Sequence, residues 1–201
     1  SLYKNRTFMC KNIYVKLTHK EHILRRSETY VGSKTTDELD MYVVKDNNLK
    51  DIKIIKRKVK NNPAFIKLFD EILTNASDHA IREGSKVKTI KITIDAKKIM
   101  VENDGPTIPI QMHPVEKVYN AELIFSHLLT GENYDDTEER MVGGRNGLGA
   151  KLVNVFSTKF KVECCDGKQL YRQWSKKNMQ VIDEPEITKV TDTKSFTRIT
   201  Y

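Results

Sequence analysis

A short glycine-rich run constrains this chain more than any other feature. The run extends from Gly143 to Lys151, reads GGRNGLGAK, and leads directly into a helical pattern. Glycines let successive backbone N–H groups approach an anion without a Cβ in the way, and the N-terminus of the following helix carries partial positive charge. The run therefore predicts a phosphate-binding loop that suits a triphosphate.

The phosphate-binding loops of the common parallel α/β folds do not fit this run. A Walker A loop has Lys-Ser or Lys-Thr directly after its last glycine, whereas here Ala150 precedes the lysine and Leu152 follows it. The dinucleotide pattern Gly-x-Gly-x-x-Gly does not fit either. Both folds also need parallel strands joined by helices, and the two clear strand pairs in this sequence are hairpins. The sequence therefore argues against both classes.

A long amphipathic helix is expected from Pro63 onwards, because proline suits the first turn of a helix and apolar residues then recur at i, i+3, i+4 and i+7. These residues are Phe65, Leu68, Phe69, Ile72, Leu73, Ala76 and Ala80. Helical projection places Glu71, Asn75, Asp78 and Arg82 in one polar stripe beside the apolar face. Such a stripe can line a cavity, although solubilising pairs on a helix flank explain it equally well.

A β-hairpin is expected next. Thr89 to Asp95 alternates strictly between apolar and polar residues, and a short turn leads into a second strand from Ile99 to Glu102. That strand runs into the turn cluster Asn103-Asp104-Gly105-Pro106. The cluster places a carboxylate at the end of a strand, where a ligand pocket often opens, although an ordinary turn has the same composition.

The other expected elements complete an α+β pattern, with helices layered on a mostly antiparallel sheet. They are a helical turn over 20–26, a helix over 121–129 with Asn120 as N-cap, a mobile loop over 132–142, a helix after the glycine run, strands over 159–165 and 169–174 joined across Asp166-Gly167, and a strand over 195–201. Residues 1 to about 60 are otherwise polar and broken, with Leu2 to Thr18 strand-like or arm-like, and they form the least packed-looking part of the chain.

The charge balance is basic but gives only a weak indication of a partner. The formal net charge is +8 and the isoelectric point is about 9.2, with lysines and arginines interleaved with acids along the chain. No motif of the helix-turn-helix, zinc-finger or basic-zipper type is present. This composition permits contact with nucleic acid, and it also describes a solvated, lysine-rich surface.

Cysteine usage and hydropathy indicate a reducing, intracellular compartment. Cys10 is isolated, and Cys164 and Cys165 are neighbours whose side chains would point to opposite faces of a strand, so no disulfide framework is expected. No apolar run approaches the roughly 20 residues that span a bilayer, so we expect no membrane partner.

Three elements follow one another in a specific combination: Glu71-x-x-x-Asn75 on a helix, Asn103-Asp104-Gly105 after a strand, and the glycine run opening a second helix. This combination resembles the GHKL (Bergerat-fold) ATPases, and within them the eukaryotic-type type IIA DNA topoisomerases, from about Tyr14 to Tyr201. The resemblance implies a two-layer α/β sandwich. It also implies an N-terminal arm over residues 1–35 and an ATPase domain over residues 36–201.

The resemblance implies ATP and Mg²⁺ as cofactors and gives roles to individual residues. Glu71 would be the general base that activates the attacking water, and Asn75 would be the Mg²⁺ ligand. Asp104 would accept a hydrogen bond from the adenine amino group, with Asn103 beside it. Because guanine presents an acceptor at the equivalent position, a carboxylate there favours adenine.

Further nucleotide contacts are implied around the phosphates and the base. The phosphate contacts would be Gly143, Arg145, Asn146, Gly147, Leu148, Gly149, Ala150 and Lys151. The others would be Asn133, His79 and Thr197, together with Tyr14, which would reach the nucleotide of the partner subunit. ATP would then close a gate between the two protomers of a homodimer. The full-length enzyme would pass one DNA duplex through a double-strand break in another, and so relax and decatenate DNA.

The sequence departs from the family pattern at several places. Thr107 replaces the second glycine of Gly-x-Gly-Ile-Pro, and Gly131-Glu132 replaces two serines. An Hsp90-type chaperone is the alternative, because it shares the fold and a run like Asn75 to Asp78, but Arg145-Asn146 favours the topoisomerase. Intact Glu71 and Asn75 argue against a non-hydrolysing binding module. The location would be the nucleus for a cellular enzyme, and the host cytoplasm or virion for one from a large DNA virus.

Overall fold

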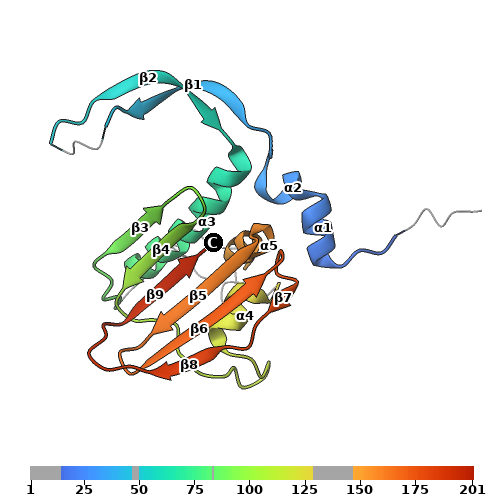
Figure 1. Cartoon of the computed structure of the whole chain (residues 1–201), viewed down its shortest axis with the longest axis vertical. Helices are drawn as coiled ribbons and strands as arrows, with labels where there is room; N and C mark the ends of the chain where they lie inside the picture. Colours follow the sequence, from blue (N-terminus) through green and yellow to red (C-terminus); the bar gives the residue numbers. More distant parts are fainter. Residues whose placement is uncertain (1–14, 47–49, 83, 129–146) are drawn as a thin grey trace, which may run out of the picture.

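A seven-stranded antiparallel sheet forms the centre of the computed structural model, which describes residues 15–46, 50–82, 84–128 and 147–201 (Figure 1). The strand order is β3 (Ile90–Ile94), β4 (Ile99–Asp104), β9 (Phe196–Thr200), β5 (Lys159–Cys165), β6 (Gln169–Lys176) and β7 (Val181–Ile182), with β8 (Glu186–Lys189) also paired with β6. Strand β9, the last in the sequence, lies in the middle of the sheet between β4 and β5.

Three helices cover one face of this sheet: α3 (Pro63–Ile81), α4 (Asn120–Ser126) and α5 (Gly149–Phe156) (Figure 1). Their buried side chains pack against those of the inner strands in one apolar core. The core includes Ile72, Phe125 and Val153 from the helices and Val101, Phe160, Val162 and Ile199 from the strands. The expected α+β fold, with helices layered on an antiparallel sheet, is confirmed.

Two short helices, α1 (His19–Arg25) and α2 (Ser27–Val31), pack on the far side of the helical layer. Helix α1 begins with a capping box in which Thr18 and Glu21 satisfy each other's backbone N–H groups. Ile23 and Val31 then pack against residues of α5 in a second apolar cluster. This part of the N-terminal segment is therefore anchored to the helices that carry the candidate site.

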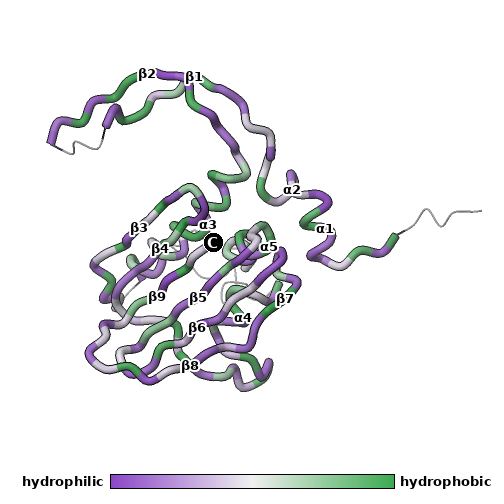
Figure 2. The backbone as a smooth tube through the Cα atoms, in the orientation of Figure 1, coloured by the Kyte–Doolittle hydropathy of each residue, from purple (hydrophilic) through white to green (hydrophobic). Residues whose placement is uncertain are grey.

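A two-stranded antiparallel ribbon, β1 (Asp37–Val44) and β2 (Ile54–Asn61), stands apart from the central sheet (Figure 1). The sequence did not predict these strands, because charged residues interrupt the apolar alternation along them (Figure 2). Cross-strand pairing nevertheless sorts the residues, with Leu39 opposite Val59 on one face and Glu38 opposite Lys60 on the other. The ribbon is largely exposed, and Leu39 retains 45% of its accessible surface.

The sheet face opposite the helices carries a straight row of alternating charges across five strands. Glu102, Arg198, Glu163, Arg172 and Glu186 lie directly opposite one another on β4, β9, β5, β6 and β8. Arg198 bridges Glu102 at 2.5 Å and Glu163 at 3.4 Å, and Arg172 reaches Glu163 at 3.3 Å. This charge row stabilises a sheet face that none of the described helices covers.

The structure corrects two expected boundaries. Asn120 is the first residue of α4 rather than its cap, and Tyr119 occupies the N-cap position. Strand β4 continues through Asn103 and Asp104, which the sequence placed in a turn. Within the described residues no helix is long and apolar enough to cross a membrane.

Candidate functional site

Helix α3 presents Glu71 at the edge of the core. The helix begins with Pro63 in its first turn and is capped by Asn62, whose side chain accepts a hydrogen bond from the Phe65 N–H at 3.0 Å. Ile72 is buried against the sheet, so Glu71 beside it lies on the flank of the helix, with 21% of its side chain exposed. Lys67, one turn earlier, forms an ion pair with its carboxylate.

The N-terminus of α5 meets this carboxylate at Gly149, its first residue. A Cβ placed on Gly149 would overlap the carboxylate of Glu71. The absence of a side chain therefore lets the positive end of one helix approach the acid of another. The structure thus brings together Glu71 and the last part of the glycine run.

Lys151 lies in the first turn of α5 and is 3% exposed. Its Nζ donates to the carbonyl of Gly147 at 2.5 Å, and Gly147 has a left-handed backbone with φ of 58°. Burial lowers the pKa of Lys151 to about 8. An anion bound at the start of α5 would stabilise the charged form of this lysine. Leu148 precedes the helix and Ala150 is buried within it.

Asn154 holds α5 in place and was not predicted from the sequence. Its fully buried amide donates to the Phe125 carbonyl at the end of α4 at 2.9 Å and to the Ser175 hydroxyl of β6 at 3.1 Å. These bonds fix the distance between α4, α5 and the sheet. The available signal was an asparagine inside the apolar run Leu152 to Val155.

The far end of α3 carries His79. Its Nε2–H donates to the Pro106 carbonyl at 2.8 Å, which ties the turn after β4 to the helix. Eight residues separate Glu71 from His79, and at 1.5 Å per residue they span roughly 12 Å along the helix axis. Asn75 is exposed between them, one turn after Glu71. The flank of α3 therefore joins two distinct clusters of polar groups.

The second cluster lies on the helix-covered face of the sheet. Asn103, Thr197 and Cys164 are directly opposite one another on β4, β9 and β5. The Asn103 amide, 5% exposed, donates to the Asp104 carbonyl at 3.0 Å, so its oxygen points the other way. The Thr107 and Thr197 hydroxyls are 2.8 Å apart. These groups offer both hydrogen-bond donors and acceptors to a ligand.

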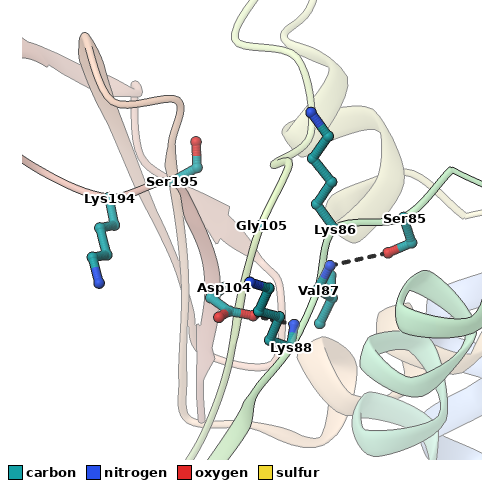
Figure 3. A pocket seen from close by; sticks show the side chains of 8 residues that line it. All are labelled: Ser85, Lys86, Val87, Lys88, Asp104, Gly105, Lys194 and Ser195. Carbon is teal, nitrogen blue, oxygen red and sulfur yellow. Dashed lines mark hydrogen bonds between the residues drawn. The ribbon is translucent and has the colours of Figure 1, made fainter.

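Asp104 lies on the opposite face, because side chains alternate along a strand. Its Oδ1 accepts hydrogen bonds from the backbone N–H groups of Lys88 at 2.8 Å and Thr89 at 2.9 Å. These hydrogen bonds hold the pKa of Asp104 below its usual value. The carboxylate also lines an open pocket of about 740 Å³ whose other lining residues include Lys86, Lys88 and Lys194 (Figure 3). The structure therefore separates Asp104 from Asn103, which the sequence placed together.

Gly105 allows the chain to pass closely at this point. Its φ is +85°, and a Cβ there would lie 3.0 Å from the Val87 nitrogen.

Several predicted contacts fall outside the described residues. They are Tyr14, Asn133, Gly143, Arg145 and Asn146.

The donors beside Glu71 suit a cation held mainly by phosphate. In the part of the chain that the structure describes, no group of three or more His, Cys, Asp or Glu side chains could hold a metal ion. Asn75 and Glu71 offer oxygen donors one helical turn apart on the flank of α3. Mg²⁺ bound with nucleotides takes one or two protein oxygens together with phosphates and waters, so this sparse set fits such an ion.

Known proteins are similar to this chain over most of its described length. The family described as "Histidine kinase-, DNA gyrase B-, and HSP90-like ATPase" matches residues 63–190. A probable DNA topoisomerase 2 of Dictyostelium discoideum is 46% identical over 195 residues, which cover 95% of this chain and 12% of that protein. DNA topoisomerase 2 top-2 of Caenorhabditis elegans is also 46% identical, over 95% of this chain and 13% of its own length. The chain thus spans a small part of these relatives.

Solved structures show the same likeness. The ATPase region of Saccharomyces cerevisiae topoisomerase II has a TM-score of 0.85 and 42% identity, covering 93% of this chain and 50% of its own. The ATPase and transducer domains of Balamuthia mandrillaris topoisomerase II have a TM-score of 0.85 and 40% identity, and the match covers 95% of this chain and 50% of theirs. The ATPase domain of Thermus thermophilus gyrase B shares the fold, with a TM-score of 0.61 and 23% identity. This match covers 90% of this chain and 38% of the gyrase chain.

Proposed function

Because the chain belongs to the histidine kinase-, DNA gyrase B- and HSP90-like ATPase family, we propose that it binds ATP along α3 and hydrolyses it as the ATPase region of a type II DNA topoisomerase. The observation that carries the proposal is the contact between Glu71 on α3 and Gly149 at the start of α5. It places a carboxylate beside a helix N-terminus, which is where the terminal phosphate of a nucleotide would bind.

The two clusters on α3 fit the two ends of a nucleoside triphosphate. The phosphates would lie at the start of α5, with Gly147, Gly149 and Lys151 as contacts. The base would lie at the other end of the helix, beside His79 and Thr197. The separation of roughly 12 Å along α3 supports this orientation.

At the base end, the register of β4 favours Asn103 over Asp104 as the adenine contact. The Asn103 side chain is on the helix-covered face, and its amide oxygen is free of the bond that its nitrogen makes to Asp104. This oxygen would accept a hydrogen bond from the exocyclic amino group of adenine. Asp104, bonded to two backbone N–H groups on the other face, would instead fix the chain at the start of β3.

Hydrolysis would use Glu71 as general base. Its carboxylate is largely shielded and held by Lys67 beside the phosphate-binding helix, so it can take a proton from a water aligned with the terminal phosphate. Backbone N–H groups at the start of α5 and the Lys151 ammonium would stabilise the charge on the phosphate oxygens. Asn75 would hold Mg²⁺, which would supply further charge neutralisation there.

The activity of the whole protein is part of the proposal. Its relatives are DNA topoisomerases, and we infer that the full-length protein passes one DNA duplex through another, relaxing and decatenating DNA. A homodimer would close on ATP binding, with Tyr14 of an arm over residues 1–35 reaching the partner's nucleotide and residues 36–201 forming the ATPase domain. A cellular enzyme of this kind would be located in the nucleus, and one from a large DNA virus would be located in the host cytoplasm or the virion. An Hsp90-type chaperone is less favoured, because the topoisomerases reported above match 93% to 95% of this chain.

Replacing Glu71 by glutamine tests the proposal. Glutamine keeps the size of the side chain but cannot accept the proton, so we expect ATP binding to persist while turnover falls by about 10²- to 10⁴-fold. Nucleotide binding by calorimetry and phosphate release would be measured together. Asp70→Asn is the matched control, because Asp70 is the neighbouring exposed carboxylate on the same helix. Unchanged turnover in Glu71→Gln would overturn the assignment.

A further inference from the structure

We propose that the open pocket beside the start of β3 binds the phosphate backbone of duplex DNA, at a surface separate from the nucleotide site. Three of its lining residues are Lys86, Lys88 and Lys194, and we call it the lysine pocket. The inference rests on the proposed function, because it takes duplex DNA as the substrate of the whole protein. It goes further by assigning a DNA contact to one place in this chain.

Three segments that are distant in the sequence form the lysine pocket (Figure 3). Lys86 and Lys88 lie on the segment that leads into β3, Gly105 directly follows β4, and Lys194 lies just before β9. Strands β3, β4 and β9 are neighbours in the antiparallel sheet, so the start of β3, the end of β4 and the start of β9 share one edge. The fold itself therefore gathers the three lysines.

The positive charge of the lysine pocket is left for a ligand. Its three lysines are exposed, and none forms an ion pair with another residue that the structure describes. Among the described lining residues Asp104 is the only acid, and the backbone N–H groups of Lys88 and Thr89 already bind its Oδ1, at 2.8 and 2.9 Å. Three ammonium groups and one carboxylate leave the lining with a net charge of +2.

Two serine hydroxyls add neutral hydrogen-bond donors to the same walls. Ser85 and Ser195 line the pocket and are half-buried. The Ser85 oxygen accepts a hydrogen bond from the Val87 N–H at 3.3 Å, which leaves its own proton for a ligand (Figure 3). Lysine and serine side chains are typical contacts to DNA phosphates, and they position a protein on the duplex without reading its sequence.

The open shape of the pocket favours an extended polyanion over a small ligand. Pockets for small molecules usually enclose most of the ligand, whereas this pocket of about 740 Å³ is open to solvent. A single small anion gains little from exposed ammonium groups, because water screens their attraction. A duplex presents its phosphates in series along a stiff backbone, and lysines that neutralise them release counterions. Duplex DNA therefore suits this pocket.

The lysine pocket and the proposed nucleotide site use different side chains of β4. Asp104 lines the pocket, whereas the Asn103 side chain lies on the helix-covered face. Neither Glu71 nor Lys151 is among the lining residues. Changes to the pocket lysines should therefore leave ATP binding and the DNA-free turnover unchanged.

Lysine footprinting on the full-length protein tests the contact directly. An acetylating reagent modifies accessible lysines, and peptide mass spectrometry reports the extent at each one. We expect a linear DNA duplex to protect Lys86, Lys88 and Lys194, and to leave Lys97 and Lys98 unprotected. These last two lie in the turn at the opposite end of the β3–β4 hairpin and are equally exposed. Inorganic phosphate at the same phosphate concentration should protect none of them.

Charge reversal tests whether the contact matters for function. Lys86→Glu combined with Lys88→Glu should raise the DNA concentration that gives half-maximal stimulation of ATP turnover. It should also reduce the dependence of the logarithm of this concentration on the logarithm of salt by about 1–2, because each lost phosphate contact removes about 0.9 from the slope. The matched control, Lys97→Glu combined with Lys98→Glu, changes the charge equally and should change neither quantity.

The outcomes separate this inference from the proposed function. If DNA fails to stimulate the unmodified protein, the proposed action on DNA and this inference are both overturned. If DNA stimulates it but protects no pocket lysine, or if phosphate protects them as well as DNA does, only the inference is overturned. An equal response of the pocket variant and its control has the same meaning. Should thermal melting show that the pocket variant is unfolded, Lys194→Gln replaces it, with a slope reduced by about 1 as the expected result and an unchanged slope as the contrary one.

Discussion

At the scale of single residues, Gly149 shows how a missing side chain lets two helices approach each other. Its position at the start of α5 leaves no room for a Cβ beside the Glu71 carboxylate. The close approach of the two helices therefore requires a residue without a Cβ at this position.

We expect Gly149→Ala to separate stability from activity. The added methyl group would push the flexible end of Glu71 aside, so the melting temperature should stay near that of the unmodified protein. ATP turnover should fall by about 10- to 100-fold, because a base displaced by about 1 Å loses its alignment. Phosphate release and thermal melting would be measured on the same samples.

A double variant checks that the effect of Gly149→Ala passes through Glu71. If it does, Gly149→Ala combined with Glu71→Gln should be no slower than Glu71→Gln alone, since both changes remove the same interaction. Multiplicative losses would instead show that the methyl group disturbs the phosphate site itself.

The pair Asn103 and Asp104 shows why a motif predicts a site better than it predicts the atoms within it. The sequence placed both residues in a turn directly after the strand that in fact continues through them. It could not tell which one faces the helices, because the strand continues through both and neighbouring side chains point to opposite faces. A single residue of register thus decides which side chain is available to a base.

At the scale of elements, the charge row from Glu102 to Glu186 should make stability depend on pH. Burial alone would raise the pKa of Glu163, but Lys161, Arg198 and Arg172 outweigh it and hold the pKa below its usual value. A carboxylate whose folded pKa is lowered stabilises the protein above its unfolded pKa of about 4.3, and this contribution is lost as the pH falls through the folded pKa.

Glu163→Gln should therefore reduce the free energy of unfolding near neutral pH by about 1–3 kcal/mol, because three cations lose their shared partner. The difference from the unmodified protein should shrink as the pH falls through the folded pKa of Glu163, because below it Glu163 is protonated in both states. Urea unfolding across this range would measure it. Glu186→Gln is the control, because Glu186 lies at the exposed end of the row, 3.9 Å from Arg172, and should have little effect. An equal loss at every pH in Glu163→Gln would contradict the electrostatic explanation.

Elements were predictable where local pattern and turn chemistry agreed. The hairpin of β5 and β6 follows from alternation on both sides of Asp166-Gly167, and α3 follows from its apolar period. The ribbon of β1 and β2 was missed because its strands are charged and largely exposed. Their sequences therefore lack the regular alternation of apolar and polar residues that a half-buried strand shows. The role of Asn154 was missed because its partners, on α4 and β6, are distant in the chain.

At the scale of the whole molecule, the proposed activity predicts that DNA controls ATP use. We expect supercoiled DNA to raise ATP turnover by the full-length protein, and added salt to reduce this effect because salt weakens contacts with phosphates. Phosphate release with and without DNA would measure it, with Glu71→Gln as the background. An ATP turnover rate that does not change when DNA is added, but rises when a client protein is added, would favour the chaperone alternative.

The central place of β9 has a consequence for how the protein is made. Glu102 on β4 and Arg198 on β9 are adjacent in the sheet but 96 positions apart in the chain. A ribosome adds about 5–20 residues per second, so β4 waits several seconds for its neighbour during synthesis. Until then, the edges of β4 and β5 that β9 will cover are open to pairing with other chains. Protection of these two edges on the nascent chain is therefore a requirement that the sheet order itself imposes.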